Sequence, residues 1–330
     1  MESQNTPSAL WIPEPGRAEL RPTPLPPLSA NTVKVRTLFS GVSRGTESLV
    51  FRGGVPASQH DRMRCPFQEG SFPGPVKYGY MNVGVIEEGR GAAAESRVGE
   101  TVFCLFPHQD LYVVPVDAAV ALPPGLPPER AILAANMETA VNAVWDARPT
   151  VGDEVVVVGA GVVGMLIAWL CSQTAGARVR VIDPEPTRAA VASRLGLSLD
   201  AGSTPSGRAD LVFHASGTPA GLVDALAEAG PEASVIEVSW FGDRLVALPL
   251  GEAFHSSRLT LRSSQVGRIP LHQAARWDYA RRMALSLRLL REPALDALVS
   301  GESPFSDLPE VLSRLATDGA ATLCHRVVYG

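Results

Sequence analysis

A glycine-rich turn between two apolar strands constrains the fold of this chain more than any other feature. Glu154–Val158 is a short β-branched run, and it leads directly into Gly159–Gly164, which reads G-x-G-x-x-G. A helical stretch, Met165–Ala175, follows, and a second strand, Arg178–Ile182, ends at Asp183. Strand, glycine turn, helix, strand and acid in this order predict a βαβ dinucleotide-binding unit in a doubly wound α/β domain.

In such a unit each glycine has its own role. Gly159 allows the tight turn, Gly161 lets the backbone approach a pyrophosphate, and Gly164 lets the helix pack on the strand. The helix N-terminus presents free N–H groups and a positive dipole end to the phosphates, and Val162 and Val163 of the turn are expected cofactor contacts. We therefore expect the turn to bind a dinucleotide.

The acid at the end of the second strand indicates which dinucleotide. Asp183 would accept hydrogen bonds from an adenosine ribose and repel a 2′-phosphate, so we expect NAD(H), with NADP(H) the weaker alternative. Arg188 lies soon after it. This arginine either stacks on adenine or is an ordinary solvated helix residue, and the second interpretation is favoured.

Composition excludes several other classes of protein. Val155–Cys171 carries no charge and on length alone approaches a membrane span, but the glycine spacing and the charged strand after it favour a soluble domain. The net charge is −5 and no basic stripe is present, which argues against nucleic acid. The N-terminus lacks the pattern of a signal peptide, and the cysteines are scattered, so we expect a reduced cytoplasmic protein.

The rest of the chain predicts a second, all-β lobe. Short strand-like runs joined by Gly and Pro turns precede the nucleotide-binding unit, at Thr32–Leu38, Val83–Glu87, Thr101–Leu105 and Leu111–Pro115. Helices and strands then alternate through Pro128–Ala147, Ala209–Ala215, Pro219–Ala229, Ala233–Val238 and Leu259–Arg262, followed by a helix at His272–Leu290 and a strand at Leu323–Tyr329.

This organisation resembles the medium-chain dehydrogenase/reductase family over nearly the whole chain. The resemblance depends on the turn Gly41–Glu47, on Lys77–Gly84, on Glu138-Thr139-Ala140 and on the closing His325–Val328. Within the family, the chain is most similar to the branch of the bacteriochlorophyllide-type alcohol dehydrogenases. The resemblance implies a GroES-like β lobe, residues 1–121 with 266–330, and a Rossmann domain, residues 122–265, with the substrate between them.

The family's catalytic zinc is not expected here. The positions of its three ligands hold Ser43 (or Arg44 in another alignment), Tyr80 and a residue near Ala135, and a catalytic site needs three Cys, His or carboxylate donors. His108 and Glu138 are the nearby donors that would contradict a zinc-less site. We predict no bound metal.

Without zinc, another group must supply or accept the proton during hydride transfer. Tyr80 occupies the position of the lost histidine ligand, and Lys77 would lower its pKa by charge proximity. An equally weighted alternative is that Tyr80 is an aromatic packing residue and that Lys77 is a solvated loop charge. His108, as a proton relay, and Ser43 complete the catalytic candidates.

Cofactor contacts are implied by the same resemblance. Arg44 and Arg326 match arginines that reach the pyrophosphate, and Thr139 matches a threonine that contacts the nicotinamide. Ser216 and Val238, each after a core strand, are further cofactor contacts. Glu47 is expected to be structural, and His214 a hydrogen-bonded core histidine.

The function predicted is that of an NAD-dependent, zinc-independent alcohol dehydrogenase or ketone reductase, acting on a polar secondary alcohol in a specialised biosynthetic pathway. An NADPH-dependent enone reductase and a non-catalytic cofactor-binding protein remain alternatives. The partners expected are a small-molecule substrate, neither nucleic acid nor membrane, and a second copy of the chain paired through Ser234–Leu250 as the edge of the Rossmann sheet.

Overall fold

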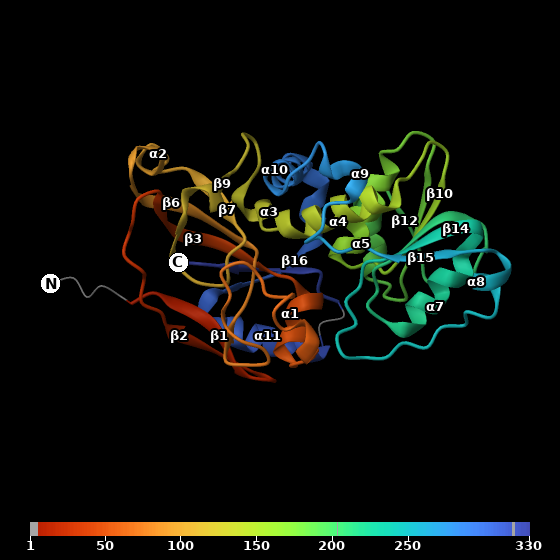
Figure 1. The fold of residues 1–330 in the computed structure, drawn as a ribbon, viewed down its shortest axis with the longest axis horizontal. Helices are drawn as coiled ribbons and strands as arrows, with labels where there is room; N and C mark the ends of the chain where they lie inside the picture. The colour runs from red at the N-terminus through yellow and green to blue at the C-terminus, as the bar shows by residue number, and fades with distance from the viewer. Residues whose placement is uncertain (1–5, 203, 319–320) are drawn as a thin grey trace. The chain divides into compact units, whose positions relative to one another are not determined.

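The chain folds into two compact units in the computed structural model, which describes residues 6–202, 204–318 and 321–330 (Figure 1). One unit comprises Met1–Ala135 and Val299–Gly330, and the other comprises Asn136–Leu298. Residues 122–135 therefore belong with the β lobe, and residues 266–298 belong with the Rossmann unit. Residues 266–298 pack with the Rossmann unit, and not with the β lobe as expected, because Arg282 in this segment is bonded to Glu138 of the same unit.

The β lobe is built around the long strand β3 (Thr32–Val42). Its alternate residues Val33, Val35 and Thr37 are buried, as expected for a strand with one face on the core. The strands lie in the order β16-β17-β3-β6-β7-β9, with β8 also paired to β3. Their bounds are β6 Asn82–Arg90, β7 Thr101–Cys104, β8 Leu111–Pro115, β9 Val120–Ala121, β16 Val299–Pro304 and β17 Cys324–Val328.

The end of the chain returns to this lobe through β17. It pairs antiparallel with β3, placing His325 opposite Val42, and parallel with β16. A smaller sheet has the order β2-β1-β5-β4. The other strands and α-helices of this lobe are β1 Ser8–Glu14, β2 Arg17–Pro22, β4 Glu69–Gly70, β5 Val76–Lys77, α1 Arg44–Phe51, α2 Ala92–Glu95, α3 Pro128–Ala131 and α11 Leu308–Asp318.

The Rossmann unit contains a parallel sheet in the order β12-β11-β10-β13-β14-β15. The central strand β10 (Glu154–Val158) pairs residue by residue with β11 (Arg178–Ile182) on one side and with β13 (Ala209–His214) on the other. The other elements are β12 Ser198–Asp200, β14 Ala229–Glu237, β15 Thr260–Ser263, α4 Ala134–Ala147, α5 Val162–Ser172, α6 Arg188–Arg194, α7 Pro219–Glu228, α8 Ala253–Ser256, α9 Leu271–Ala274 and α10 Tyr279–Leu289.

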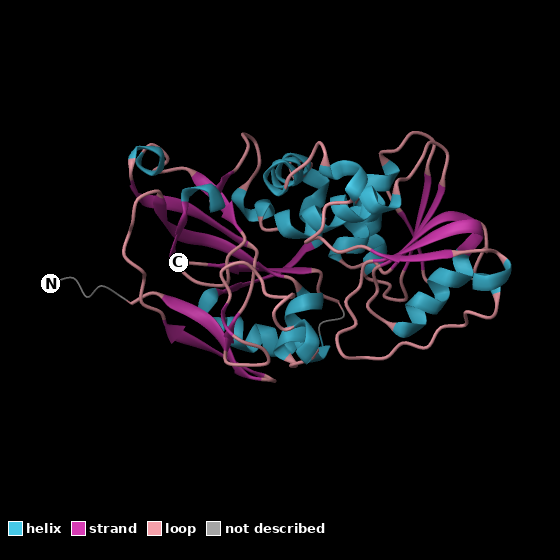
Figure 2. Cartoon of the chain, viewed as in Figure 1, coloured by secondary structure: helices cyan, strands magenta, loops and turns pink. Residues whose placement is uncertain are grey.

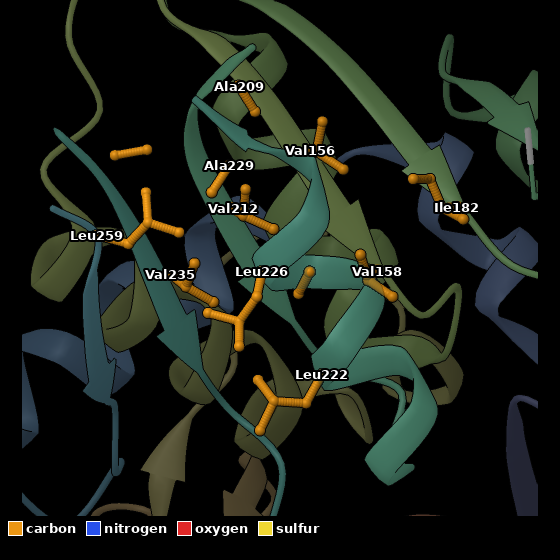
Figure 3. Packing of buried hydrophobic residues seen from close by; sticks show 12 residues of the cluster. Val156, Val158, Ile182, Ala209, Val212, Leu222, Leu226, Ala229, Val235 and Leu259 are labelled. Atoms are coloured by element: carbon orange, nitrogen blue, oxygen red, sulfur yellow. The ribbon is translucent and has the colours of Figure 1, made fainter. Parts of the chain in front are cut away.

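Helix α7 shows how the sequence builds the core of this unit. Thr218 caps it by accepting a hydrogen bond from the Gly221 N–H, and Pro219 occupies its first turn. Leu222 and Leu226, at helical spacing, pack over the strands (Figure 3). They join Val156, Val158, Val212 and Val235 in one buried cluster. Each buried leucine contributes about 1.5–3 kcal/mol relative to an exposed one.

The prediction that Ser234–Leu250 forms the edge of the Rossmann sheet is wrong. β14 lies between β13 and β15, so its backbone groups are already paired on both sides. β12 and β15 are the outer strands of the described part of this sheet. The segment that follows β14 runs as a loop to α8 (Figure 2). Pairing of two copies stays a prediction, and β15 is the outer strand available on that side.

The uncharged stretch that approached a membrane span ends within a short helix. α5 stops at Ser172. Across the described residues, no helix is both long and apolar enough to cross a membrane.

Candidate functional site

The glycine turn after β10 has the geometry that a dinucleotide requires. Gly159 has φ +108°, and a Cβ there would lie 2.5 Å from the Ser216 nitrogen. A Cβ at Gly164 would lie 1.9 Å from the Gly159 carbonyl oxygen. A Cβ at Gly161, in contrast, would meet nothing within 4 Å. Packing therefore requires glycine at the first and third positions, and the space beside the second is open for a ligand.

Helix α5 begins at Val162, three residues before the expected start at Met165. Gly161 precedes it in an extended conformation, without a side chain to cap it. The N–H groups of the first turn, which includes Val162 and Val163, therefore have no side-chain cap from this residue. Such groups bind phosphate oxygens well, because the helix dipole adds to their hydrogen bonds.

Asp183 follows β11 and braces the same turn. One carboxylate oxygen accepts a hydrogen bond from the Ala160 N–H at 2.7 Å, and the other accepts one from the Glu185 N–H at 2.9 Å. Each oxygen has a second lone pair, so the half-buried carboxylate can still accept from ribose hydroxyls. Asp183 thus makes a structural contact with the turn, and the ribose contact that the sequence predicted stays a prediction.

Arg188 does not lie where the sequence indicated. It begins α6, and its exposed fraction is only 3 %. The preference for a solvated helix residue is therefore wrong. A buried guanidinium is retained only where it finds partners, so this residue is part of the packed structure.

A row of polar side chains continues the site along the carboxyl edge of the sheet. His214 ends β13 and is fully buried, as predicted. Its Nδ1 lies 2.7 Å from Glu237 Oε2, and its Nε2 lies 2.7 Å from Ser216 Oγ. Val238, another predicted cofactor contact, donates its N–H to the His214 carbonyl. Sequence reasoning missed the pairing with Glu237, since the two residues belong to different strands.

The predicted catalytic residues of the β lobe lie around a second buried histidine. His108 Nε2 is 2.8 Å from Glu47 Oε2, and His108 Nδ1 is 2.7 Å from Ser40 Oγ. Ser40 in turn is 2.9 Å from the Tyr329 hydroxyl. The Ser43 N–H donates to the other Glu47 oxygen. Both nitrogens of His108 are therefore already used by the protein.

Tyr80 contacts this cluster through hydroxyl groups. Its phenol is hydrogen-bonded to the side chains of Ser43 and Thr46, which lower its pKa slightly. Burial acts in the opposite direction more strongly, and with the Glu47 carboxylate it raises the pKa of Tyr80 well above the ordinary value of 10. The phenol consequently stays protonated at neutral pH.

The expected effect of Lys77 on Tyr80 is corrected by the structure. Lys77 is almost completely buried, and its ammonium group is bonded to Glu69 and, at 2.8 Å, to Gln109. It also lies 5.3 Å from the centre of the Phe106 ring. Its charge is balanced by these partners, and the pKa of Tyr80 is raised, not lowered. The idea that Lys77 is a solvated loop charge is wrong for the same reason.

The remaining candidate residues have defined positions. Glu138 is bonded to Arg282, at 3.0 Å, in the Rossmann unit. Arg326 is bonded to Glu302 in the β lobe, at 2.6 Å from its Nε. Arg44 is the first residue of α1, and Thr139 lies in α4. No sequence pattern marked Arg282 or Glu302, because each is far along the chain from its partner.

The two units together define a fold class. A GroES-like β lobe containing both ends of the chain and a Rossmann domain form the architecture of the medium-chain alcohol dehydrogenases. No protein-family model matches the chain.

Three dehydrogenases are similar to the chain, with sequence identities between 16% and 26%. D-guloside 3-dehydrogenase from Escherichia coli (strain K12) is 26% identical over 307 residues, covering 85% of this chain and 88% of that protein. An alcohol dehydrogenase from Escherichia coli CFT073, solved with NADH, has a TM-score of 0.75 and 18% identity, covering 98% of this chain and 99% of the other. A dehydrogenase from Sinorhizobium meliloti 1021 assigned as zinc-binding, solved with NADP, has a TM-score of 0.77 and 16% identity, covering 98% and 100%.

Proposed function

We propose that this protein is an NAD(P)-dependent oxidoreductase of the medium-chain type that interconverts a polar secondary alcohol and its ketone. The observation that carries the proposal is the glycine turn. It leaves open space only beside Gly161, next to the uncapped start of α5. The similarity to D-guloside 3-dehydrogenase supports a polyhydroxylated substrate.

NAD(H) is the cofactor that we favour. The solved relatives contain NADH in one case and NADP in another, so fold alone does not choose between them. Asp183 supports NAD(H), because its carboxylate ends β11 and would repel a 2′-phosphate. When bound, the nicotinamide ring supplies or accepts the hydride. The protein binds the cofactor by the N–H groups of α5 and orients it by the turn.

Chemistry independent of zinc is part of the proposal. Ser43, Tyr80 and Ala135 cannot together ligate zinc, because a catalytic site needs three Cys, His or carboxylate donors. His108 is bonded to Glu47 and Ser40, and Glu138 is bonded to Arg282. Throughout the described residues, no group of three or more His, Cys, Asp or Glu side chains is placed to hold a metal ion. This donor set does not fit the ion.

Tyr80 is our candidate for the polar group that acts on the substrate oxygen. Its raised pKa keeps the phenol protonated, so it would donate a hydrogen bond to a carbonyl oxygen and stabilise the charge that develops there. Ser43 and Thr46 fix the direction of this O–H group. Tyr80 would thus act as a hydrogen-bond donor, and not as the ionised base that a lysine neighbour would create.

The first test is a fluorescence titration of the purified protein with NADH and NADPH. We expect NADH to bind at micromolar concentrations and NADPH much more weakly. Gly164→Ala should weaken NADH binding at least about tenfold, because the added methyl group displaces the turn. Gly251→Ala is the matched control, since a Cβ there meets nothing within 4 Å. If neither dinucleotide binds the wild-type protein, the proposed function is wrong.

The second test addresses Tyr80. Tyr80→Phe should lower kcat for ketone reduction about 100-fold and leave the Kd for NADH unchanged, because only the transition-state hydrogen bond is lost. Tyr78→Phe is the control, as its ring lies 6.0 Å from that of Tyr80 and is buried. Turnover of Tyr80→Phe within a few-fold of wild type would assign the role to another group.

A further inference from the structure

A carboxylate, an imidazole and a hydroxyl are joined at the carboxyl ends of β13 and β14. Glu237 Oε2 lies 2.7 Å from His214 Nδ1, and His214 Nε2 lies 2.7 Å from Ser216 Oγ. Glu237 Oε1 accepts a hydrogen bond from the Ser239 N–H at 2.6 Å. Glu237 therefore has partners for both oxygens, and they come from groups that carry no fixed charge.

The hydrogen bonds indicate where the protons lie. Nδ1 of His214 faces a carboxylate, which can only accept, so this nitrogen carries the hydrogen. Nε2 faces a hydroxyl group, which can donate to it. With a neutral imidazole every group in the row has a partner, and the carboxylate of Glu237 carries the negative charge of the row.

Arg244, a cation on this side, is exposed. Arg244 lies over the Phe241 ring at 5.7 Å, and Phe241 stacks on His214 with ring centres 5.9 Å apart. Arg244 donates to the Gly217 carbonyl at 2.9 Å, so its guanidinium is fixed by a neutral acceptor. An exposed cation is screened by water and offsets little of a charge in the sheet edge.

The strand order places this charge at one end of the dinucleotide site. β10 carries the glycine turn, and β11, which ends at Asp183, lies on one side of it. β13 and β14 lie on the other side, and the Ser216 backbone packs against Gly159. A dinucleotide that crosses this edge places its adenosine at Asp183 and its pyrophosphate at α5. The nicotinamide half then lies over β13 and β14.

We propose that Glu237 is a specificity-determining residue that favours the oxidised over the reduced form of the nicotinamide cofactor. The inference rests on the proposed function. The oxidised ring carries a positive charge and the reduced ring is neutral, so a negative charge held beside the ring lowers the free energy of the oxidised complex only. His214 is a positioning residue: it holds the carboxylate in place and contributes no charge of its own.

The experiment is calorimetric titration of the wild-type protein and of variants with NAD+ and NADH, all at the same pH. In Glu237→Gln, the ratio of the Kd for NAD+ to that for NADH should rise at least about fivefold. Glu232→Gln is the matched control: it removes one charge from an earlier position of the same strand, where Glu232 is exposed and pairs with Arg258. Its ratio should equal that of wild type.

A second variant separates charge from packing. His214→Gln keeps the Glu237 carboxylate, so both affinities should fall together and the ratio should stay near that of wild type. If Glu237→Gln does not fold, H214L/E237L replaces the pair by apolar groups and should show the raised ratio. A wild-type ratio in Glu237→Gln or the double variant, a raised ratio in Glu232→Gln, or a raised ratio in His214→Gln would overturn the inference. Failure of the wild-type protein to bind either form would instead reject the proposed function, and the inference with it.

Discussion

Each unit contains a glutamate–histidine pair whose histidine is buried and which continues into a serine. In the β lobe, Glu47 binds Nε2 of His108, and Nδ1 binds Ser40. In the Rossmann unit the nitrogens are exchanged: Glu237 binds Nδ1 of His214, and Nε2 binds a serine hydroxyl. The chemistry is the same, but the surroundings are not.

The difference lies in what each row connects. In the β lobe the row joins α1, the segment before β8, β3 and the last residues of the chain, and it ends at the buried Tyr329 hydroxyl. In the Rossmann unit the row connects neighbouring strands and ends at Thr218, which is exposed. A polar row enclosed at every point stabilises the fold. A similar row that ends at an exposed residue on the proposed cofactor edge is available for function.

Removing the imidazole of the β lobe should give the largest effect. His108→Ala removes the imidazole from Glu47, whose side chain is only 3% exposed and keeps the Ser43 N–H on its other oxygen. The free energy of unfolding should fall by about 3–5 kcal/mol. Chemical denaturation followed by circular dichroism measures this, and the folded fraction should still bind NADH.

The matched change is His214→Ala. The Glu237 side chain is 13% exposed and keeps the Ser239 N–H, so water can replace part of what is lost. We expect a loss of about 1–3 kcal/mol here, together with weaker cofactor binding. Equal losses in the two variants would break the distinction between a structural and a functional row.

The sequence predicted the elements whose signal is local. β8, β10 and β11 have the bounds that were expected, because β-branched runs between turn residues define them. β12 and β16 were missed. β16 contains Gly301, Glu302, Ser303 and Pro304, and its burial alternates only between partial and exposed, so no apolar pattern marks it as a strand. It exists because β17 offers it a parallel partner.

The candidate site divides in the same way. The glycine turn and Asp183 lie within one continuous stretch of the chain and were predictable from spacing. The partners of Lys77 and Glu138 were not predictable from spacing, because Glu69, Gln109 and Arg282 belong to other elements and meet them only in the folded protein. Spacing along a sequence identifies a cofactor turn, whereas a hydrogen-bonded pair between distant segments leaves no such pattern.

A third buried histidine sharpens the comparison, since it is bonded to a hydroxyl and not to a carboxylate. His325 Nε2 lies 2.9 Å from Ser303 Oγ, and burial, with the charge of Arg314, lowers its pKa to about 4. In the unfolded chain its pKa is about 6.5. The unfolded state therefore binds a proton that the folded state does not, in the window between these values.

Stability contributed by the neutral His325 is thus present above about pH 6.5 and is lost as the pH falls towards 4. We expect a loss on the order of 1–3 kcal/mol across this window. Denaturant unfolding at several pH values measures it, and His325→Gln should flatten the profile. An equal slope in wild type and His325→Gln would assign the pH dependence to other groups.

The smallest expected effect concerns the buried end of the β-lobe row. Tyr329→Phe removes the hydroxyl bonded to Ser40 and keeps the ring that stacks on Phe305 at 4.4 Å. The free energy of unfolding should fall by about 0.5–1.5 kcal/mol, the net value of one hydrogen bond, while the Kd for NADH stays the same. In a Ser40→Ala background the same change should cost almost nothing, because its partner is already gone, and a double-mutant cycle measures that coupling. Additive losses would show that the two hydroxyls act separately, and that the row is a set of independent contacts and not one connected structural unit.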